Sequence, residues 1–395
     1  MAVSVTFPSG FVAGSVHAGI KEPGRPDLSF VGFSDGERHA SAAVFTRSQA
    51  AAAPVLVSRS NLAASLGEVR GVVLSSGNAN ALTGERGVQD ARMMTAKVAK
   101  SFGGLASEYL ICQTGLIGIY LPVEAIMTGI EALPGSVGAS ESAARSAAEG
   151  IMTTDTFAKM ATRDLGGVRI GGMAKGAAMI APNMATMLSV ITTDASLSPE
   201  RAQAALASAV DQSFNRITID GCTSTNDTVV LLSSGLAGEP GGEFEESLTD
   251  LSLELARMIV TDAEGGSKVI TVRVIEALDE EEALACARQV AGSLLVKCSF
   301  LGEDPYWGRV VAEVGVSSGD IDVSRVSVSY QGITVCTQGV DALERLSVHE
   351  RDLLRSRMSE KDILLEICLG RGGRSAEVLT ADIGPGYLEE NRGTS

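Results

Sequence analysis

Short apolar strands followed by amphipathic helices recur along this chain, and that order restricts the fold to the α/β classes. Residues 71–76, GVVLSS, form an apolar run that leads into the turn GNANALTG. Residues 85–102 then carry apolar side chains at helical spacing and stop at Gly103-Gly104, a common helix end. A strand, a turn and a helix in this order are typical of α/β proteins.

The same organisation continues in the second half of the chain. A helix is predicted from Ser198, an N-cap residue followed by proline, to about Phe214. Apolar residues spaced by three and four predict a further helix face, formed by Phe244, Leu248, Leu251, Leu255 and Met258. Residues 269–275, VITVRVI, alternate as a strand. Glu264 is therefore expected on a helix-to-strand connection, a frequent location of functional groups.

The C-terminal part of the chain predicts a smaller α/β subdomain at about 280–370. Its elements are a helix over 280–297, a hairpin around Gln331-Gly332 in RVSVSYQGITVC, and a strand in DILLEICLG. A length of 395 residues exceeds the roughly 100–200 residues of a typical domain. One large body or two domains are therefore expected.

Charge and hydropathy exclude several classes of partner. The formal net charge is −16, which disfavours binding to nucleic acid and to anionic membranes, because both are negative. No run reaches the ~18 apolar residues of a membrane span, and the first residues lack the basic and apolar regions of a signal peptide. A soluble, cytoplasmic protein with small-molecule or protein partners is expected.

The cysteines and histidines narrow the possible chemistry further. The six cysteines form no CxxC pair and are predicted to be reduced and mostly buried; they are Cys112, Cys222, Cys286, Cys298, Cys336 and Cys368. The three histidines, His17, His39 and His349, form no HExxH motif, and the chain has no GxxxxGK[ST] loop. We therefore expect neither a metal nor a tightly held cofactor.

The stretch IAPNMATMLSVITTDA, residues 180–195, places one hydroxyl, that of Thr186, between a turn and an apolar strand. The ordinary interpretation is a strand threonine that bonds a backbone carbonyl. The alternative is a nucleophile whose base is its own α-amine, with a pKa of about 7.7–8.0 once the bond between Ala185 and Thr186 is cut. The same hydroxyl could make that cut by attacking the Ala185 carbonyl and forming an ester that water hydrolyses.

Acyl transfer also requires donors for the oxyanion, and the segment ICQTGLIG offers them. Thr114 and Gly115 follow the strand-like run YLIC, where a hydroxyl and exposed backbone N–H groups could point into a cleft. Taken alone, a Thr-Gly pair is more often an ordinary turn.

Several stretches resemble one enzyme family in order along nearly the whole chain. The strongest is GGMAKGAAMIAPNMATMLSVITTDA (171–195), which resembles the signature of the ornithine acetyltransferase family. The others are GFVAGSVHAGIKEPGRPDL, AAVFTRS, GNANALTG, CQTGLIG, IMTTDTFAK, FNRITIDGCTSTNDT, DAEGGSK and DPYWGR. Members of that family move an acetyl group from N-acetylornithine to glutamate in arginine biosynthesis.

The resemblance implies self-cleavage between Ala185 and Thr186, giving an alpha chain of residues 1–185 and a beta chain of residues 186–395. Thr186 would be the nucleophile, and Thr114 with Gly115 the oxyanion hole. The residues implied in substrate binding are Thr153, Lys175, Thr186, Glu264, Asn391 and Ser395, with Thr154 as an alternative to Thr153. A lysine suits an α-carboxylate and an acid suits the amine of ornithine. Lys175 and Glu264 have an ordinary alternative as solvated charges, and Thr153 has one as a cap.

The implied mechanism is ping-pong through an acetyl-threonine, and some family members also accept acetyl-coenzyme A. The implied fold is a layered αββα body similar to N-terminal-nucleophile hydrolases, in an assembly of two alpha and two beta chains. The chain departs from the family pattern at Cys222, Ala178 and Tyr306 and in its short tail. These departures leave open the same chemistry on an unusual amino acid. Two further alternatives are an amidase or aminopeptidase of the N-terminal-nucleophile type and a non-catalytic binding protein.

Overall fold

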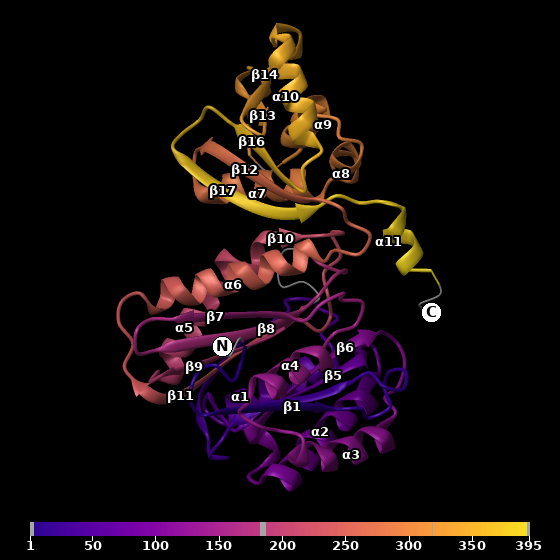
Figure 1. The fold of residues 1–395 in the computed structure, drawn as a ribbon, viewed down its shortest axis with the longest axis vertical. Coiled ribbons are helices and arrows are strands. Elements are labelled where there is room, and N and C mark those ends of the chain that lie inside the picture. Colours follow the sequence, from indigo (N-terminus) through magenta and orange to yellow (C-terminus); the bar gives the residue numbers. More distant parts are fainter. Residues whose placement is uncertain (1–3, 182–186, 318, 393–395) are drawn as a thin grey trace. The chain divides into compact units, whose positions relative to one another are not determined.

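The computed structural model describes residues 4–181, 187–317 and 319–392, which form two compact units (Figure 1). The first unit comprises Met1–Asn215 and Thr223–Ile259, and the second comprises Arg216–Cys222 and Val260–Thr394. The subdomain predicted at about 280–370 lies inside the second unit, which extends beyond it at both ends.

One sheet of the first unit carries the first predicted strand and is covered by helices on one face. Its strands run in the order β1-β2-β5-β6, with β1 Phe11–Val16, β2 Leu28–Phe33, β5 Gly71–Asn78 and β6 Tyr109–Leu116. The helices on this face are α1 Ala53–Ala64, α2 Gly84–Phe102 and α3 Val123–Ala132, whereas α4 Glu141–Gly150 belongs to the apolar cluster of the opposite face. Apolar residues of α1, α2 and α3 pack on Phe30, Val73 and Ile111 of this sheet. The predicted strand 71–76 and the predicted helix 85–102 are confirmed.

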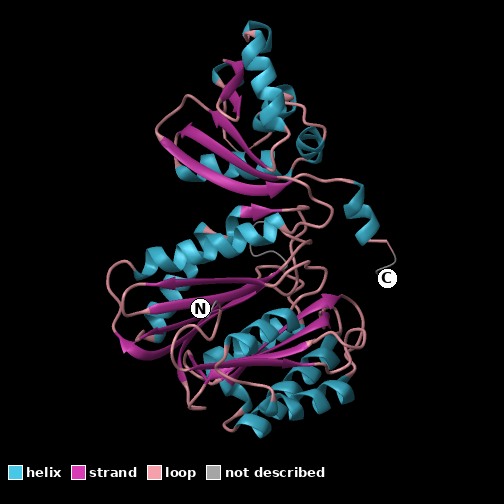
Figure 2. Cartoon of the chain, viewed as in Figure 1, coloured by secondary structure: helices cyan, strands magenta, loops and turns pink. Residues whose placement is uncertain are grey.

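The other sheet of the first unit packs face to face against the first sheet (Figure 2). Its strands run in the order β4-β3-β11-β9-β8-β7, with β4 Glu68–Val69, β3 His39–Phe45, β11 Thr228–Gly238, β9 Leu188–Ala195, β8 Arg169–Lys175 and β7 Lys159–Asp164. Between the sheets, Val72 and Leu74 belong to the same apolar cluster as Met173, Val190 and Val230.

Two helices cover the outer face of this second sheet. They are α5 Pro199–Gln212, which packs against β3, and α6 Phe244–Thr261. A Cβ added to Gly172 of β8 would lie 2.9 Å from Leu251 and 3.0 Å from Leu255, so α6 approaches the strand closely. The order helix, sheet, sheet, helix confirms the predicted α/β class and its αββα layering.

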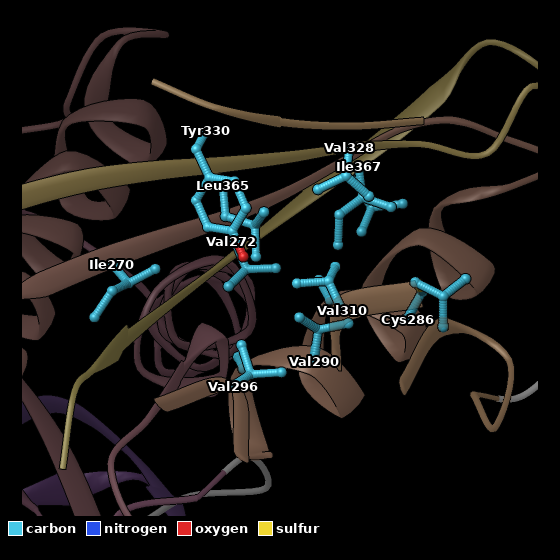
Figure 3. Close-up of a cluster of buried hydrophobic side chains, with 14 of the residues drawn as sticks. Ile270, Val272, Cys286, Val290, Val296, Val310, Val328, Tyr330, Leu365 and Ile367 are labelled. Carbon is cyan, nitrogen blue, oxygen red and sulfur yellow. The ribbon is translucent and has the colours of Figure 1, made fainter. Parts of the chain in front are cut away.

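The second unit is a seven-stranded sheet with one apolar face. The strand order is β10-β17-β12-β16-β13-β14-β15, with β10 Ile217–Thr218, β17 Arg374–Ala381, β12 Val269–Ala277, β16 Asp362–Cys368, β13 Ser327–Tyr330, β14 Ile333–Thr337 and β15 Val340–Asp341. The helices are α7 Glu280–Gly292, α8 Leu294–Leu301, α9 Trp307–Val314, α10 Val348–Met358 and α11 Pro385–Glu390. In Figure 3, sheet residues face helix residues; those labelled include Ile270, Val272, Leu365 and Ile367, and Val290, Val296 and Val310.

The predicted hairpin around Gln331-Gly332 is confirmed, and both turn residues have positive φ. The predicted single helix over 280–297 is wrong, because the chain breaks at Ser293. That residue is extended, and its hydroxyl accepts from the Val296 N–H to begin α8. Along the described ranges no single helix is long and apolar enough to span a membrane. Helices α7 and α8 reach that length and composition only when taken together, and a 63° bend separates them.

Two smaller predictions also need correction. Met258 of the predicted α6 face is only half-buried, and its neighbour Ile259 is fully buried instead. All six cysteines are free, but only three of them are buried, namely Cys112, Cys286 and Cys336. Cys222 and Cys298 are exposed, so the prediction of mostly buried cysteines is wrong for half the set.

Candidate functional site

Lys175, the last residue of β8, joins two threonines that lie far from it in the sequence. Its side chain is buried, and its Nζ donates to Thr153 Oγ1 at 2.8 Å and to Thr114 Oγ1 at 3.3 Å. The structure thus brings together three residues that the sequence singled out separately. Thr153, and not Thr154, is bonded to the lysine in this arrangement.

A buried carboxylate, that of Asp155, organises the charge around Lys175. Its Oδ1 accepts from Lys159 Nζ and from the Gly176 N–H, both at 2.7 Å, and its Oδ2 accepts from the Thr153 N–H at 2.9 Å. Lys175 Nζ lies 4.0 Å from Oδ2. Burial would raise the pKa of Asp155, but Lys175, Lys159 and these hydrogen bonds outweigh it and lower the pKa to about 2. Asp155 is therefore ionised at neutral pH.

Gly115 lies at a close approach between the backbones of β5 and β6. It pairs with Gly77 in a parallel ladder, and its φ of +130° is in a region that favours glycine. A Cβ on Gly115 would lie 2.2 Å from the Gly77 carbonyl carbon and 2.5 Å from the Asn78 nitrogen. A glycine is therefore required here on structural grounds alone.

Asp227 holds the start of β9, directly after the predicted cleavage site. Its Oδ1 accepts from the Met187 N–H at 2.9 Å, and the carboxyl group is fully buried. Within the described ranges its Oδ2 has no hydrogen-bond partner. Burial raises the pKa of Asp227 well above its ordinary range, against the effects of Met187, Ser224 and Lys175. The predicted residues Ala185 and Thr186 lie outside the described residues.

Two of the remaining predicted residues, Glu264 and Asn391, belong to the second unit. Asn391 Nδ2 donates to Glu264 Oε2 at 2.9 Å, so these two are brought together. The turn after Glu264 packs tightly against α11, since a Cβ on Gly265 would lie 2.1 Å from the Tyr387 nitrogen. Glu264 lies on the connection between α6 and β12, as predicted. Ser395 lies outside the described residues.

With the site described, comparison with known proteins identifies the family. The ArgJ family matches residues 12–393 of the chain. The chain belongs to the ArgJ family. It is 42% identical over 391 residues to the arginine biosynthesis bifunctional protein ArgJ of Thermobifida fusca, covering 98% of this chain and 99% of that one. It is 41% identical over 398 residues to the protein of the same name from Mycobacterium leprae, covering 99% and 95%.

A solved structure of an ornithine acetyltransferase from Mycobacterium tuberculosis, complexed with ornithine, is 37% identical to this chain. It covers 46% of this chain and 95% of that one, with a TM-score of 0.43. The family predicted from the sequence motifs is confirmed by the family match and by the full-length relatives.

Three charged residues of this ArgJ-family chain were missed by reasoning from the sequence. Asp155 and Lys159 lie in the quoted motif IMTTDTFAK, and Asp227 lies in TSTNDT. All three side chains are buried. Asp155 lies between two threonines and Asp227 precedes an apolar run, where a charge is unusual without a partner; the sequence around Lys159 carries no such signal.

Proposed function

We propose that this ArgJ-family protein is an N-acetyltransferase that moves an acetyl group from N-acetylornithine to glutamate. The relatives that match almost its whole length carry the name arginine biosynthesis bifunctional protein. The observation that supports the chemistry is the bonded set of Lys175, Thr153 and Thr114, which connects a predicted carboxylate-binding lysine to a predicted oxyanion donor.

The protonation of this set suits an oxyanion hole. A lysine ammonium can only donate, so Thr114 Oγ1 is the acceptor in its bond with Lys175. The Thr114 hydroxyl proton is then available to donate to a developing oxyanion, together with the N–H of Gly115. One such donor is worth about 2.7–4 kcal/mol in a well-studied hydrolase. Lys175 and the Thr153 hydroxyl would bind the α-carboxylate, which N-acetylornithine and glutamate both carry.

The proposed reaction begins with a cut between Ala185 and Thr186, which gives Thr186 a free α-amine. That amine takes the hydroxyl proton as Thr186 attacks the acetyl carbonyl of N-acetylornithine, and ornithine leaves. The amine of glutamate then attacks the acetyl-threonine and regenerates the hydroxyl. Glu264 would bind the side-chain amine of ornithine, and Asn391 and Ser395 would contact the amino-acid substrate. No metal takes part, and acetyl-coenzyme A is a possible second donor.

The two fragments would stay together as an assembly of two alpha and two beta chains in the cytoplasm. The proposed cut between Ala185 and Thr186 supplies a simple first test. Denaturing intact-mass measurement of the wild type should give two fragments that divide between Ala185 and Thr186. Thr186→Ala should give one full-length mass, and Thr128→Ala, an exposed threonine of α3, should be cleaved like the wild type.

The activity test follows the acetyl group itself. The wild type should release ornithine from N-acetylornithine in the presence of glutamate and form N-acetylglutamate, and Thr186→Ala should do neither. An uncut wild type without transfer would refute the proposal. Rapid release of acetate without any amine acceptor would identify an amidase of the N-terminal-nucleophile type instead.

A further inference from the structure

The loop between β1 and β2 is held by one buried carboxylate. Asp27 accepts hydrogen bonds of 2.6–3.1 Å from consecutive backbone N–H groups, those of Ala18, Gly19, Ile20 and Lys21. His17 Nδ1 also lies 3.3 Å from Asp27 Oδ2. The oxygens of Asp27 are therefore committed to the backbone of this loop, which places the Lys21 side chain.

The ammonium of Lys21 is partly desolvated, yet it has no carboxylate partner. It donates to the Pro26 carbonyl at 3.0 Å, and it makes no ion pair with any residue that the structure describes. Burial, followed by the charge of Arg25, lowers its pKa to about 8. The charges of Asp27 and Asp155 favour this ammonium but make no ion pair with it, so an anionic ligand in direct contact would offset more of the cost of its burial.

Lys21 borders the same site as Lys175. A Cβ on Gly77 would lie 3.2 Å from Lys21 Cγ, so the lysine stem runs along the end of β5, where Gly77 pairs with Gly115. The charges of Lys175 and Asp155 both affect the Lys21 ammonium. Arg25 Nη2 donates to the Thr153 carbonyl at 3.4 Å. This corner of the first unit thus gathers Lys21, Arg25 and Lys175 near Asp155, a carboxylate that is already hydrogen-bonded to Lys159 and to two backbone N–H groups.

The signs of the substrate charges decide what this corner would bind. In the proposed reaction the donor side chain ends in a cation, and the acceptor side chain ends in a carboxylate. A protein carboxylate such as Glu264 attracts the cationic end of the donor side chain and repels the carboxylate end of the acceptor side chain, whatever the distance. The acidic acceptor therefore requires a cation of its own, and Lys175 is already assigned to the α-carboxylate.

Building on the proposed function, we infer that Lys21 binds the side-chain carboxylate of the acceptor and makes the second half-reaction selective for an acidic amino acid. Arg25 adds positive charge at the mouth of this subsite. The donor has no second carboxylate, so Lys21 contributes little to the first half-reaction.

The test separates the two half-reactions in the full-length processed protein. Ornithine release from N-acetylornithine is measured with hydroxylamine as a small neutral acceptor, and then with glutamate and with glutamine. Lys21→Met should change the hydroxylamine reaction by less than about twofold. It should raise the KM for glutamate by about tenfold to a hundredfold, the range of a hydrogen bond to a charged group. The preference for glutamate over glutamine should fall by a similar factor.

Matched variants control for charge and packing. Lys97→Met removes a partly buried lysine of α2 that pairs with Glu131, and it should leave all three reactions unchanged. Lys21→Arg keeps the charge and should retain the glutamate preference. Above about pH 8 the wild type should lose that preference as Lys21 loses its proton, whereas Lys21→Arg should keep it.

Two results would overturn the inference. If Lys21→Met raises the KM for N-acetylornithine and for glutamate by the same factor, Lys21 binds the shared α-carboxylate or acts only on the fold. An unchanged preference for glutamate over glutamine in Lys21→Met likewise refutes it. A wild type that transfers acetyl to none of the three acceptors overturns the proposed function itself, and that result is distinct from the other two.

Discussion

Replacing Asp227 by asparagine should remove a pH-dependent destabilisation of the first unit. The Asp227 carboxyl is fully buried, its Oδ1 accepts from the Met187 N–H, and its Oδ2 has no hydrogen-bond partner in the described part of the chain. Burial raises its pKa well above the ordinary range, so the folded protein holds this proton to a higher pH than the unfolded chain does. Asparagine has nearly the same shape, keeps the carbonyl acceptor for Met187, and never ionises.

The magnitude follows from proton linkage. In the unfolded chain the Asp227 carboxyl loses its proton near its ordinary pKa of about 3.9, whereas the folded chain holds it until the pH reaches the raised pKa. Between these two values the folded state binds more protons, so the free energy of unfolding falls as pH rises. The slope is up to about 1.4 kcal/mol for each pH unit. The free energy of unfolding of Asp227→Asn lacks this dependence on pH. The stability of the variant relative to the wild type should therefore increase by up to that amount for each pH unit.

The assay has to report on the first unit. The single tryptophan, Trp307, lies in the second unit, so its fluorescence would follow the wrong part of the chain. Pulse proteolysis in urea at about pH 5.5, 6.5 and 7.5, with mass spectrometry of peptides from β5 and β11, measures the unfolding free energy of the first unit itself. Asp250→Asn, an exposed residue of α6, is the matched control and should track the wild type.

A constant difference between Asp227→Asn and the wild type across this pH range would refute the reasoning. It would mean that Asp227 is ionised in the folded protein, with Lys175 as the source of the compensating charge. Asp227→Ala separates the hydrogen bond from the titration. It leaves the buried Met187 N–H unpaired, and we expect a loss of about 1–3 kcal/mol at every pH.

Two further predictions concern the surroundings of the site. Gly115→Ala should lower the melting temperature sharply in thermal denaturation, since its Cβ would collide with the Gly77 backbone; Gly135→Ala, with no atom within 4 Å of the added Cβ, should have little effect, and equal shifts would contradict this. Asp155→Asn should cost about 3–5 kcal/mol in urea unfolding, because it leaves the buried Lys159 without its counter-charge. In the wild type this stabilisation should be complete above pH ~4 and be lost only as acid unfolding approaches pH ~2, so a loss beginning near neutral pH would argue against it.

The local elements follow from short-range patterns and were predictable where such patterns are strong. The helix ending at Gly103, the strand β12 and the hairpin at Gln331-Gly332 all agree with the periodicity and turn chemistry of their own residues. The break at Ser293 was not predictable in the same way. Apolar residues continue on both sides of it, and the two helices separate because each packs on the same sheet from a different direction.

Family membership and the identity of the candidate chemical groups were also readable from the sequence, because each motif is a contiguous run of residues. The pairing of Glu264 with Asn391, and of Lys175 with Thr114 and Thr153, adds geometry to residues already singled out. The motifs alone contain no distances.

Only the tertiary structure shows how the buried charges are arranged. Asp155 lies 4.0 Å from the ammonium of Lys175, which is 20 residues away in the sequence. Asp227 accepts a hydrogen bond from the Met187 N–H, which is 40 residues away. Lys21 reaches the same site from a loop near the N-terminus. A buried ionisable group depends on partners that arrive from other strands, and the spacing of residues along one strand carries no information about them. For that reason the candidate reacting groups can be identified from the sequence, whereas the packing of the sheets determines their protonation and their partners.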